Sequence, residues 1–198
     1  MAQKKSMAKE LFEWIEMIVL SACAVLLFFT FVARPARVDG PSMENTLHHG
    51  EMLLLSDILY EPEPGDILVF QKINVDSHHY PIVKRVIATE GETVDIDFDT
   101  WTVTITDESG NTRVLDESKY RQAFCSDPEC KNGCPQKRVI SSSQIYPLTV
   151  GKGELFVMGD NRNHSLDSRS STLDLVKKDE VIGKVLFRFF PLSKFGGV

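Results

Sequence analysis

The sequence lacks an excess of basic residues. Its 22 lysines and arginines are outnumbered by 28 aspartates and glutamates, which gives a formal net charge of −6. Three lysines balance three glutamates in residues 1–33, so the whole negative charge belongs to residues 34–198. A domain of that sign repels phosphate groups, and we therefore expect no nucleic-acid partner.

Cysteine is also scarce, and its spacing does not match a standard zinc site. Cys125, Cys130 and Cys134 lie close together, but a zinc framework needs a fourth ligand. We favour a disulfide between two of these three, in a loop outside the cytoplasm, over a metal site, and the spacing leaves the pair open. Cys23 lies in an apolar run, where it is expected to pack as a small apolar side chain.

Histidine does not supply metal or catalytic chemistry either. His48-His49 and His78-His79 fit no standard zinc spacing, and pairs of this kind in polar segments are usually exposed. A catalytic role for His164 or any other histidine is disfavoured. The sequence also has no internal repeat and no low-complexity tract. We expect no metal ion and no cofactor.

One long stretch has no charge at all. Met17 to Ala33 holds 17 residues, of which only Ser21 and Thr30 are polar, and as a helix it spans about 26 Å, close to the hydrocarbon core of a bilayer. A buried core helix would show a polar stripe, and a cleaved signal peptide would not continue into Arg34-Pro35. The sequence predicts a membrane anchor over residues 14–33, a cytoplasmic tail over 1–13 and an extracytoplasmic domain over 34–198.

The sequence of residues 34–198 predicts a mainly β domain. Short apolar or alternating runs bounded by turn residues predict strands, and Trp101, Val103 and Ile105 should share one face. Residues 116–150, which hold the cysteine loop, are expected to form an irregular insertion. The predicted fold is a partly open β-barrel or sandwich with one N-terminal transmembrane helix. The predicted strands are Glu51–Leu55, Asp66–Gln71, Pro81–Ala88, Thr93–Phe98, Thr100–Thr106, Arg113–Leu115, Leu155–Met158 and Val181–Phe190.

Two short segments contain a candidate catalytic pair. Ser42 lies in a turn, Gly40-Pro41-Ser42-Met43, and Lys84 lies inside an apolar run, Val83-Lys84-Arg85-Val86. Burial disfavours a charged lysine, but a desolvated neutral lysine is a competent general base for a nearby serine. The simpler interpretations are a turn serine and a lysine that reaches solvent. Because adjacent strand residues point to opposite faces, at least one of Lys84 and Arg85 must face the interior or a cleft.

A polar segment follows the strand predicted at Leu155–Met158. Ten of the eleven residues from Gly159 to Arg169 are polar or glycine. Such a segment is commonly a solvated loop. It also contains two aspartates and two arginines at close spacing, which can build a buried frame of ion pairs beside a site.

Taken in order, these segments resemble the conserved boxes of bacterial type I signal peptidases, in particular the single-span type found in Firmicutes. The resemblance runs from about residue 14 to residue 191. It implies a membrane-anchored serine endopeptidase that removes N-terminal signal peptides, with small residues before the cut, from exported preproteins. The matching segments are Gly40–Met43, Gly65–Phe70, Lys84–Val86, Gly159–Arg169 and Ile182–Lys184.

The resemblance also implies residue roles. Ser42 is the expected nucleophile, Lys84 the general base, Ser165 a hydrogen-bond partner that orients the lysine amine, and Met43 a packing residue beside the nucleophile. Gly40 departs from the family, which often has a hydroxyl side chain there to bind the oxyanion, so backbone N–H groups must serve instead. The residues implied to form the supporting frame are Asp160, Arg162, Asp167 and Arg169.

Chain reach agrees with a membrane-inserted substrate. Ser42 lies nine residues after Ala33, so it is within about 32 Å of the predicted span. The alternative function is a non-catalytic, membrane-tethered β domain that binds exported segments. A self-cleaving repressor-type protease is a third possibility, but it would need a basic DNA-binding module where this chain has an apolar span.

Overall fold

The computed structural model describes residues 7–72, 80–98, 100–120 and 144–198. Its elements alternate short strands with turns, and the only long helix among the described residues is at the N-terminus. The elements are α1 Met7–Phe31, β1 Arg34–Arg37, β2 Met52–Ser56, β3 Ile67–Phe70, β4 Ile82–Thr89, β5 Thr93–Asp97, β6 Thr102–Thr106, β7 Thr112–Val114, β8 Leu148–Thr149, β9 Glu154–Met158, η1 Arg162–His164, β10 Val176–Lys177, η2 Lys178–Glu180, β11 Val181–Phe190 and η3 Leu192–Lys194.

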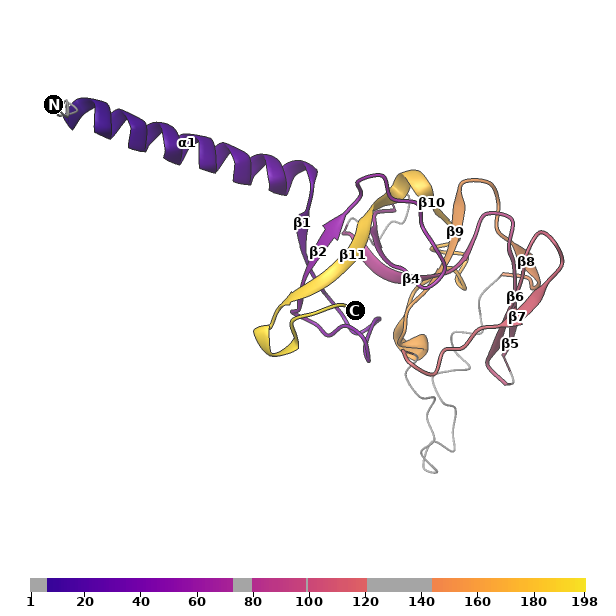
Figure 1. The fold of residues 1–198 in the computed structure, drawn as a ribbon. Coiled ribbons are helices and arrows are strands. Elements are labelled where there is room, and N and C mark those ends of the chain that lie inside the picture. The colour runs from indigo at the N-terminus through magenta and orange to yellow at the C-terminus, as the bar shows by residue number, and fades with distance from the viewer. Residues whose placement is uncertain (1–6, 73–79, 99, 121–143) are drawn as a thin grey trace.

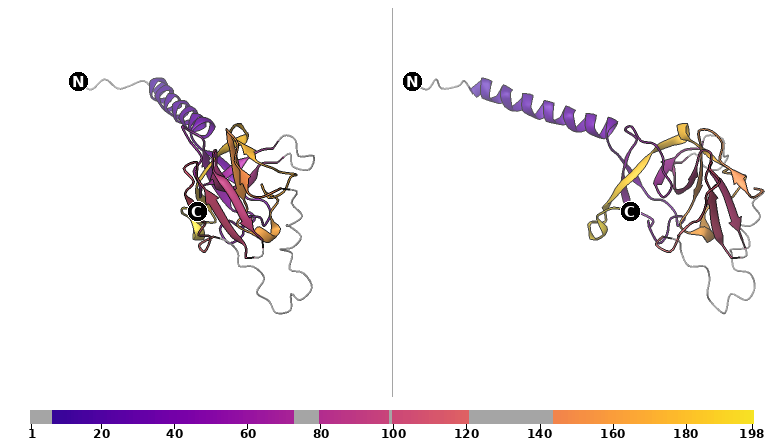
Figure 2. Two further views of the ribbon diagram at one scale, coloured as in Figure 1. Left: turned by 90° about the vertical axis from the view of Figure 1, so that its right-hand side faces the viewer. Right: turned by 45° about the vertical axis from the view of Figure 1, so that its right-hand side comes forward.

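Helix α1 projects away from the β domain in every view (Figures 1 and 2). By length and composition it is the one helix among the described residues that could cross a membrane. It begins at Met7, ahead of the anchor predicted over residues 14–33. The charged residues before Trp14 are good helix formers, so the helix continues through them.

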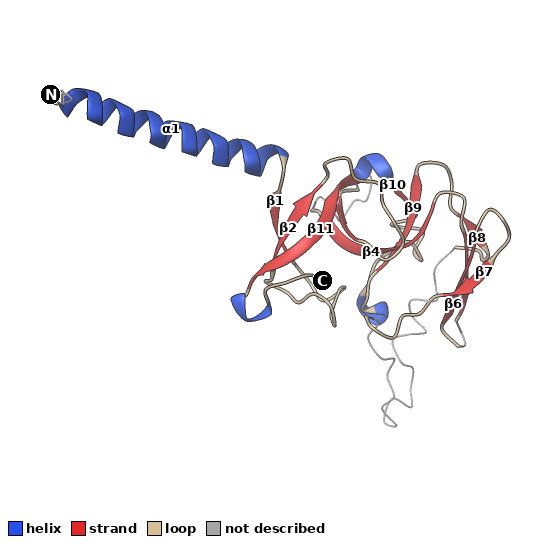
Figure 3. Ribbon diagram, viewed as in Figure 1, coloured by secondary structure: helices blue, strands red, loops and turns tan. Residues whose placement is uncertain are grey.

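Seven strands form the larger sheet, in the order β1-β2-β11-β3-β4-β9-β10. Strand β11 is ten residues long and pairs with β2 on one side and β3 on the other, with register shifts along both partners. Such irregularities increase bend and twist, and the sheet curls into a partly open half-barrel (Figure 3). The predicted fold class, mainly β with a partly open barrel and one N-terminal apolar helix, is confirmed.

A second sheet, in the order β7-β6-β5-β8, covers the end of the larger sheet that lies farther from α1 (Figure 1). Its inner face alternates as predicted, because Val103 and Ile105 on β6 are buried while the threonines between them are half-buried, and Trp101 shares their burial. Val103 and Ile105 pack with Phe156 and Met158 of β9 in one core. The core therefore joins the two sheets.

The eight predicted strands are present, and three further strands were not predicted. β1 consists of Arg34-Pro35-Ala36-Arg37, a poor strand sequence, and it forms because it pairs along its whole length with β2 at the sheet edge, where proline is tolerated. β8 pairs with β5 inside the region expected to be irregular. The clustered cysteines and His78-His79 lie outside the described residues.

Candidate active site

The candidate nucleophile lies on a loop that is closed at its base. Val38 N donates to Glu51 O at 2.9 Å, and Gly50 N donates to Val38 O at 2.9 Å. Gly40 has a φ of +87°, a left-handed conformation that glycine adopts at little cost. We call residues 38–51 the nucleophile loop. Ser42 therefore lies in a short, fixed turn of this loop.

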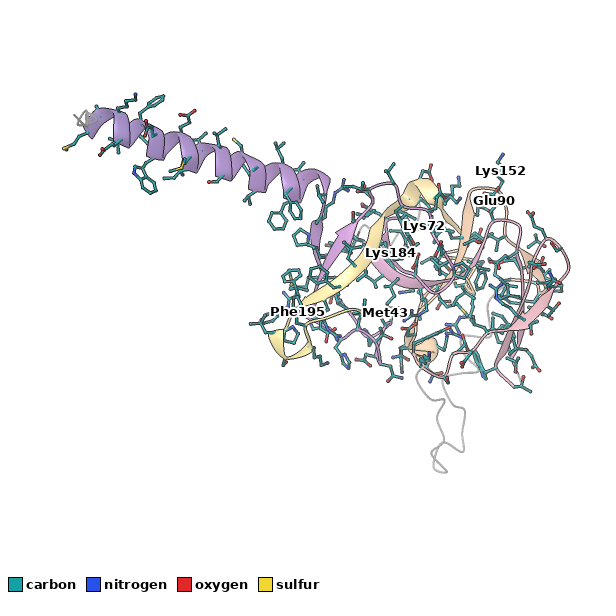
Figure 4. All side chains as sticks on the ribbon, in the orientation of Figure 1. Met43, Lys72, Glu90, Lys152, Lys184 and Phe195 are labelled. Atoms are coloured by element: carbon teal, nitrogen blue, oxygen red, sulfur yellow. The ribbon has the colours of Figure 1, made fainter. Side chains whose placement is uncertain are left out.

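Met43 anchors the nucleophile loop to the domain. Its side chain is 1% exposed and packs in a cluster with Leu47, Leu53 and Leu55. Met43 lies within the β domain, on the side of β11 that faces away from α1 (Figure 4). Burial of its thioether next to Ser42 holds the serine backbone against the sheet, as the expected packing role requires.

Strand β4 brings Lys84 to Ser42. The lysine side chain is 2% exposed, and its Nζ is within hydrogen-bond distance of Ser42 Oγ, at 2.8 Å, and of Val83 O, also at 2.8 Å. The two residues are separated by 42 positions in the sequence. The structure therefore places the two candidate catalytic side chains in direct contact.

The environment of Lys84 favours its neutral form. Burial lowers the pKa of its amine from the ordinary value of 10.5 to about 8. The nearby carboxylates of Asp167 and Asp160 act in the opposite direction, and the Arg169 guanidinium adds to the lowering. An amine with a pKa of about 8 is partly deprotonated near neutral pH, so it can accept a proton there.

Ser165 does not bind the lysine amine as expected. Its Oγ is buried and makes no well-formed hydrogen bond to a described residue. Its hydroxyl instead contributes to lowering the pKa of the Asp167 carboxyl. The segment brings Ser165 beside Gly159, so closely that a Cβ on Gly159 would overlap both Ser165 Oγ and the Ser42 carbonyl oxygen.

The expected ion pair between Asp167 and Arg169 is present. Arg169 Nε and Nη2 donate to the two carboxylate oxygens of Asp167 at 2.8 and 2.9 Å, and both residues are at most 1% exposed. Burial raises the pKa of Asp167, but the Arg169 charge and its hydrogen bonds outweigh burial and leave that pKa below its ordinary value. Asp167 also accepts from Gly159 N at 3.0 Å, which fixes the backbone at the start of the polar segment.

Asp160 and Arg162 belong to the same frame, but they do not pair with each other. Asp160 accepts from Arg85 Nε at 2.9 Å and Nη2 at 2.8 Å, and from Thr46 Oγ1 at 2.5 Å. Arg162 pairs with Glu117 and donates from Nε to Gly159 O at 3.0 Å. Sequence reasoning missed Thr46 and Glu117, because nothing in the local pattern indicates their distant partners.

The sequence marks Arg85 only as the residue that follows Lys84, but in the structure Arg85 is a central member of the frame. Besides Asp160 it donates from Nη1 to Gly65 O at 2.7 Å, and its guanidinium lies 4.2 Å from the centre of the Tyr120 ring. Tyr120 and Glu117 belong to the region 116–150 that was expected to be irregular. Its first described residues therefore pack directly on the frame.

A cleft of about 370 Å³ opens at the Ser42–Lys84 pair. Gly40 and Met43 lie at its lining, and apolar walls come from Val38, Ile82 and Leu166. β9 pairs with β4 only from Arg85 onward, so the edge of Ile82–Lys84 that faces away from β3 has no strand partner among the described residues. The site therefore combines a nucleophile, a base, a small apolar cleft and an open strand edge.

The described residues contain no cluster of three or more metal-ligating side chains. His49 contacts Asp39, and His48 contacts Glu51. His164 lines the cleft, but it makes no hydrogen bond to Ser42 within the part of the chain that the structure describes. Among the described residues, the titratable group in contact with Ser42 Oγ is the Lys84 amine.

Known proteins match almost the whole chain. Residues 11–190 match the family described as "Signal peptidase, peptidase S26". Signal peptidase I of Bacillus licheniformis is 33% identical over 199 residues, which cover 98% of this chain and 97% of that protein. Signal peptidase IB of Staphylococcus aureus strain N315 is 32% identical over 198 residues, covering 96% and 94%. A solved signal peptidase I from Enterococcus faecalis V583 is 29% identical, with a TM-score of 0.42, over 63% of this chain and 97% of that chain.

Proposed function

The chain belongs to the signal peptidase family, peptidase S26, and from this premise we propose that it is a membrane-anchored serine endopeptidase with a Ser42/Lys84 dyad. Its substrates are exported preproteins, from which it removes the N-terminal signal peptide. The observation that supports the dyad most directly is the 2.8 Å contact between Lys84 Nζ and Ser42 Oγ. A lysine pKa of about 8 supports the role of the amine as base.

The proposed reaction begins when neutral Lys84 takes the Ser42 Oγ proton as the oxygen attacks the scissile carbonyl. The carbonyl oxygen becomes an oxyanion, which the Ser42 backbone N–H stabilises. Protonated Lys84 then gives its proton to the leaving amine as the C–N bond breaks, leaving an acyl-enzyme. Lys84 next takes a proton from water as the water oxygen attacks the ester. Lys84 then returns that proton to Ser42 Oγ as the ester C–O bond breaks, which releases the signal peptide with a free carboxyl group and regenerates Ser42.

The proposed substrate binds as an extended strand. The unpaired edge of Ile82–Lys84 offers backbone groups for an added strand, and strand addition is a common mode of peptide recognition. The cleft walls formed by Val38, Ile82 and Leu166 suit small apolar side chains. Residues with small side chains before the cut are the ones that such a cleft accepts.

The proposed anchor is helix α1, with residues 34–198 outside the cytoplasm. The helix is long and apolar enough to span a bilayer. Ser42 follows its last residue, Phe31, by 11 positions, so the nucleophile is within about 40 Å of the membrane end of the helix. The lysines ahead of the span favour a cytoplasmic N-terminus. This placement suits a substrate that is itself inserted in the membrane.

The test is cleavage of a labelled preprotein by the purified full-length chain in detergent, with Ser42→Ala as the matched variant. We expect the wild type to release a fragment cut after small residues, and the variant to release none while its melting temperature stays close to that of the wild type. A non-catalytic domain that binds exported segments would instead bind the preprotein equally in both forms and leave it uncut, which would overturn the proposal.

A further inference from the structure

Asn161 connects the polar segment after β9 to the nucleophile loop. Asn161 is 1% exposed. Its Nδ2 donates to the Pro41 carbonyl oxygen at 3.1 Å, and its backbone N–H donates to the Ser42 carbonyl oxygen at 3.1 Å. One residue, 120 positions away in the sequence, therefore holds the peptide groups on both sides of the Ser42 Cα.

The contact between Asn161 and Pro41 helps to set the direction of the Ser42 backbone N–H. The Pro41 carbonyl and the Ser42 N–H belong to the same trans peptide, which is planar, so the two groups point in opposite directions. The Pro41 carbonyl oxygen accepts from Asn161 Nδ2 and, within the turn, from Glu44 N at 3.0 Å, and these two donors together fix the direction of the Ser42 N–H. In the described part of the chain this N–H donates to no other residue, so it is free to receive an oxyanion.

Gly40 increases the share of oxyanion stabilisation that the Ser42 backbone N–H must provide. A glycine two positions before the nucleophile has no hydroxyl with which to bind the oxyanion, and Gly40 lines the cleft. The backbone donor must then supply more of the stabilisation. A hydrogen bond accepted by the carbonyl of a peptide also polarises the group and strengthens its N–H as a donor.

We propose that Asn161 is a positioning residue for the oxyanion site, because it orients the Pro41–Ser42 peptide through the Nδ2 contact. This inference rests on the proposed function. It differs from a role in the dyad, because within the described residues Asn161 donates to the backbone oxygens of Pro41 and Ser42 and makes no hydrogen bond to Ser42 Oγ or Lys84 Nζ. Asn161 acts through backbone, and its loss should affect the transition state and not ground-state binding.

The variants that test this are Asn161→Ala and Asn161→Leu. Leucine has a shape close to that of asparagine, carries no donor and no charge, and leaves the backbone contact to Ser42 O in place, so it serves if the alanine variant does not fold. Asn163→Ala is the matched control. Asn163 lies in the short helix η1, which Asn161 precedes as the N-cap residue, and the Asn163 side chain makes no hydrogen bond to the nucleophile loop within the described residues.

We expect kcat for preprotein cleavage to fall about 10- to 100-fold in both Asn161 variants, since removal of an oxyanion donor costs about 10²–10³-fold and here the donor is only misdirected. KM should change less than about threefold. The apparent pKa of the kcat/KM profile should stay as in the wild type, because Lys84 is untouched. Asn163→Ala should keep wild-type kcat.

A pair of peptide inhibitors separates this role from a general loss of structure. A peptide aldehyde adds Ser42 Oγ–H across its carbonyl to give a tetrahedral hemiacetal whose oxygen occupies the oxyanion site. The corresponding peptide alcohol cannot add. In the Asn161 variants the affinity for the aldehyde should fall by about the same factor as kcat/KM. The affinity for the alcohol should stay as in the wild type.

Unchanged kcat in a folded Asn161→Leu protein would overturn the inference, and so would equal weakening of the aldehyde and the alcohol. In both cases a wild type that cleaves the preprotein leaves the proposed function standing. A wild type that neither cleaves the preprotein nor binds the aldehyde more tightly than the alcohol would overturn both.

Discussion

Lys84 and Arg85 are adjacent in β4 and point to opposite faces, yet both side chains are buried, at 2% and 8% exposure. Lys84 contacts Ser42 Oγ, and Arg85 makes a two-bond ion pair with Asp160. Asp160 also accepts from Thr46, which belongs to the nucleophile loop. One strand therefore holds the candidate base on one face and, on the other, the frame that fixes the loop of the nucleophile.

The first prediction concerns the pH dependence of cleavage. Only the neutral amine of Lys84 can act as base, and its pKa is about 8. We expect log(kcat/KM) to rise with a slope of about one below pH 8 and to level off above it. Lys84→Arg should be inactive at every pH, because a guanidinium stays protonated. A wild-type profile that is flat from about pH 6 to 9 would contradict the lysine as the base.

The second prediction concerns stability. Burial places the pKa of Lys84 at about 8 in the folded chain, below its ordinary value of 10.5, so at neutral pH the lysine destabilises the fold by on the order of 3 kcal/mol. Lys84→Met, which has a similar volume and no charge, should abolish cleavage and raise the free energy of unfolding by up to this amount at pH 7. The cost in the wild type is fully present below pH 8 and is lost as pH rises from 8 to 10.5.

Urea denaturation of the full-length chain at pH 7 and pH 10 measures this, with the fluorescence of Trp101 as signal. The advantage of Lys84→Met over the wild type should shrink at the higher pH. The idea would be contradicted if the stability difference between Lys84→Met and the wild type grew with pH, or if the variant were less stable than the wild type at pH 7. Either result would show that burial does not disfavour the charged form of Lys84.

The two candidate catalytic residues were predicted from the sequence. Ser42 lies in a turn made by Gly40 and Pro41, and Lys84 lies in an apolar strand. Local chemistry makes both residues candidates, and the resemblance to signal peptidases singled them out as a pair. Their contact across 42 positions was inferred from the order of the conserved segments, and no local pattern requires it. The alternation in β6 likewise predicted which face is buried, because the period of a strand is local.

The partners within the frame could not be predicted, because they are set by topology. Asp160 and Arg162 were expected to lie together, and they do, but each pairs with a residue from another part of the chain, 75 and 45 positions away. Strand β1 was missed for a related reason: its sequence has little strand propensity, and it forms through pairing with β2. Tertiary contacts outweigh local preference at these positions.

The third prediction tests the close approach at Gly159. Gly159→Ala would place a Cβ against Ser165 Oγ and the backbone oxygen of Ser42, and the backbone cannot move aside as a flexible side chain can. We expect kcat/KM to fall at least about tenfold, with about 1–3 kcal/mol lost from the free energy of unfolding. Gly151→Ala is the control, because there the nearest atoms are the flexible end of Glu154. Equal activity of the two variants would contradict the tight packing behind Ser42.

The fourth prediction tests the contact between residues 116–120 and the frame. Glu117 is 6% exposed and pairs with Arg162, which is 1% exposed. Glu117→Gln keeps the shape but removes the charge, and it leaves a buried guanidinium without its counterion. Breaking a buried pair in this way costs about 3–5 kcal/mol, and the retained amide oxygen should bring the loss toward the lower figure.

The matched control is Glu61→Gln, at an exposed pair with Lys178 in which Glu61 is 81% exposed. Exposed pairs contribute at most about 1 kcal/mol, so this variant should unfold close to the wild type in urea. Because Arg162 also donates to Gly159 O, a loosened Arg162 frees the backbone that lies against Ser42. Glu117→Gln should therefore lose cleavage activity at temperatures where it is still folded. If the two variants lose equal stability, the Glu117–Arg162 pair does not hold the frame, and residues 116–120 are only a covering of the site.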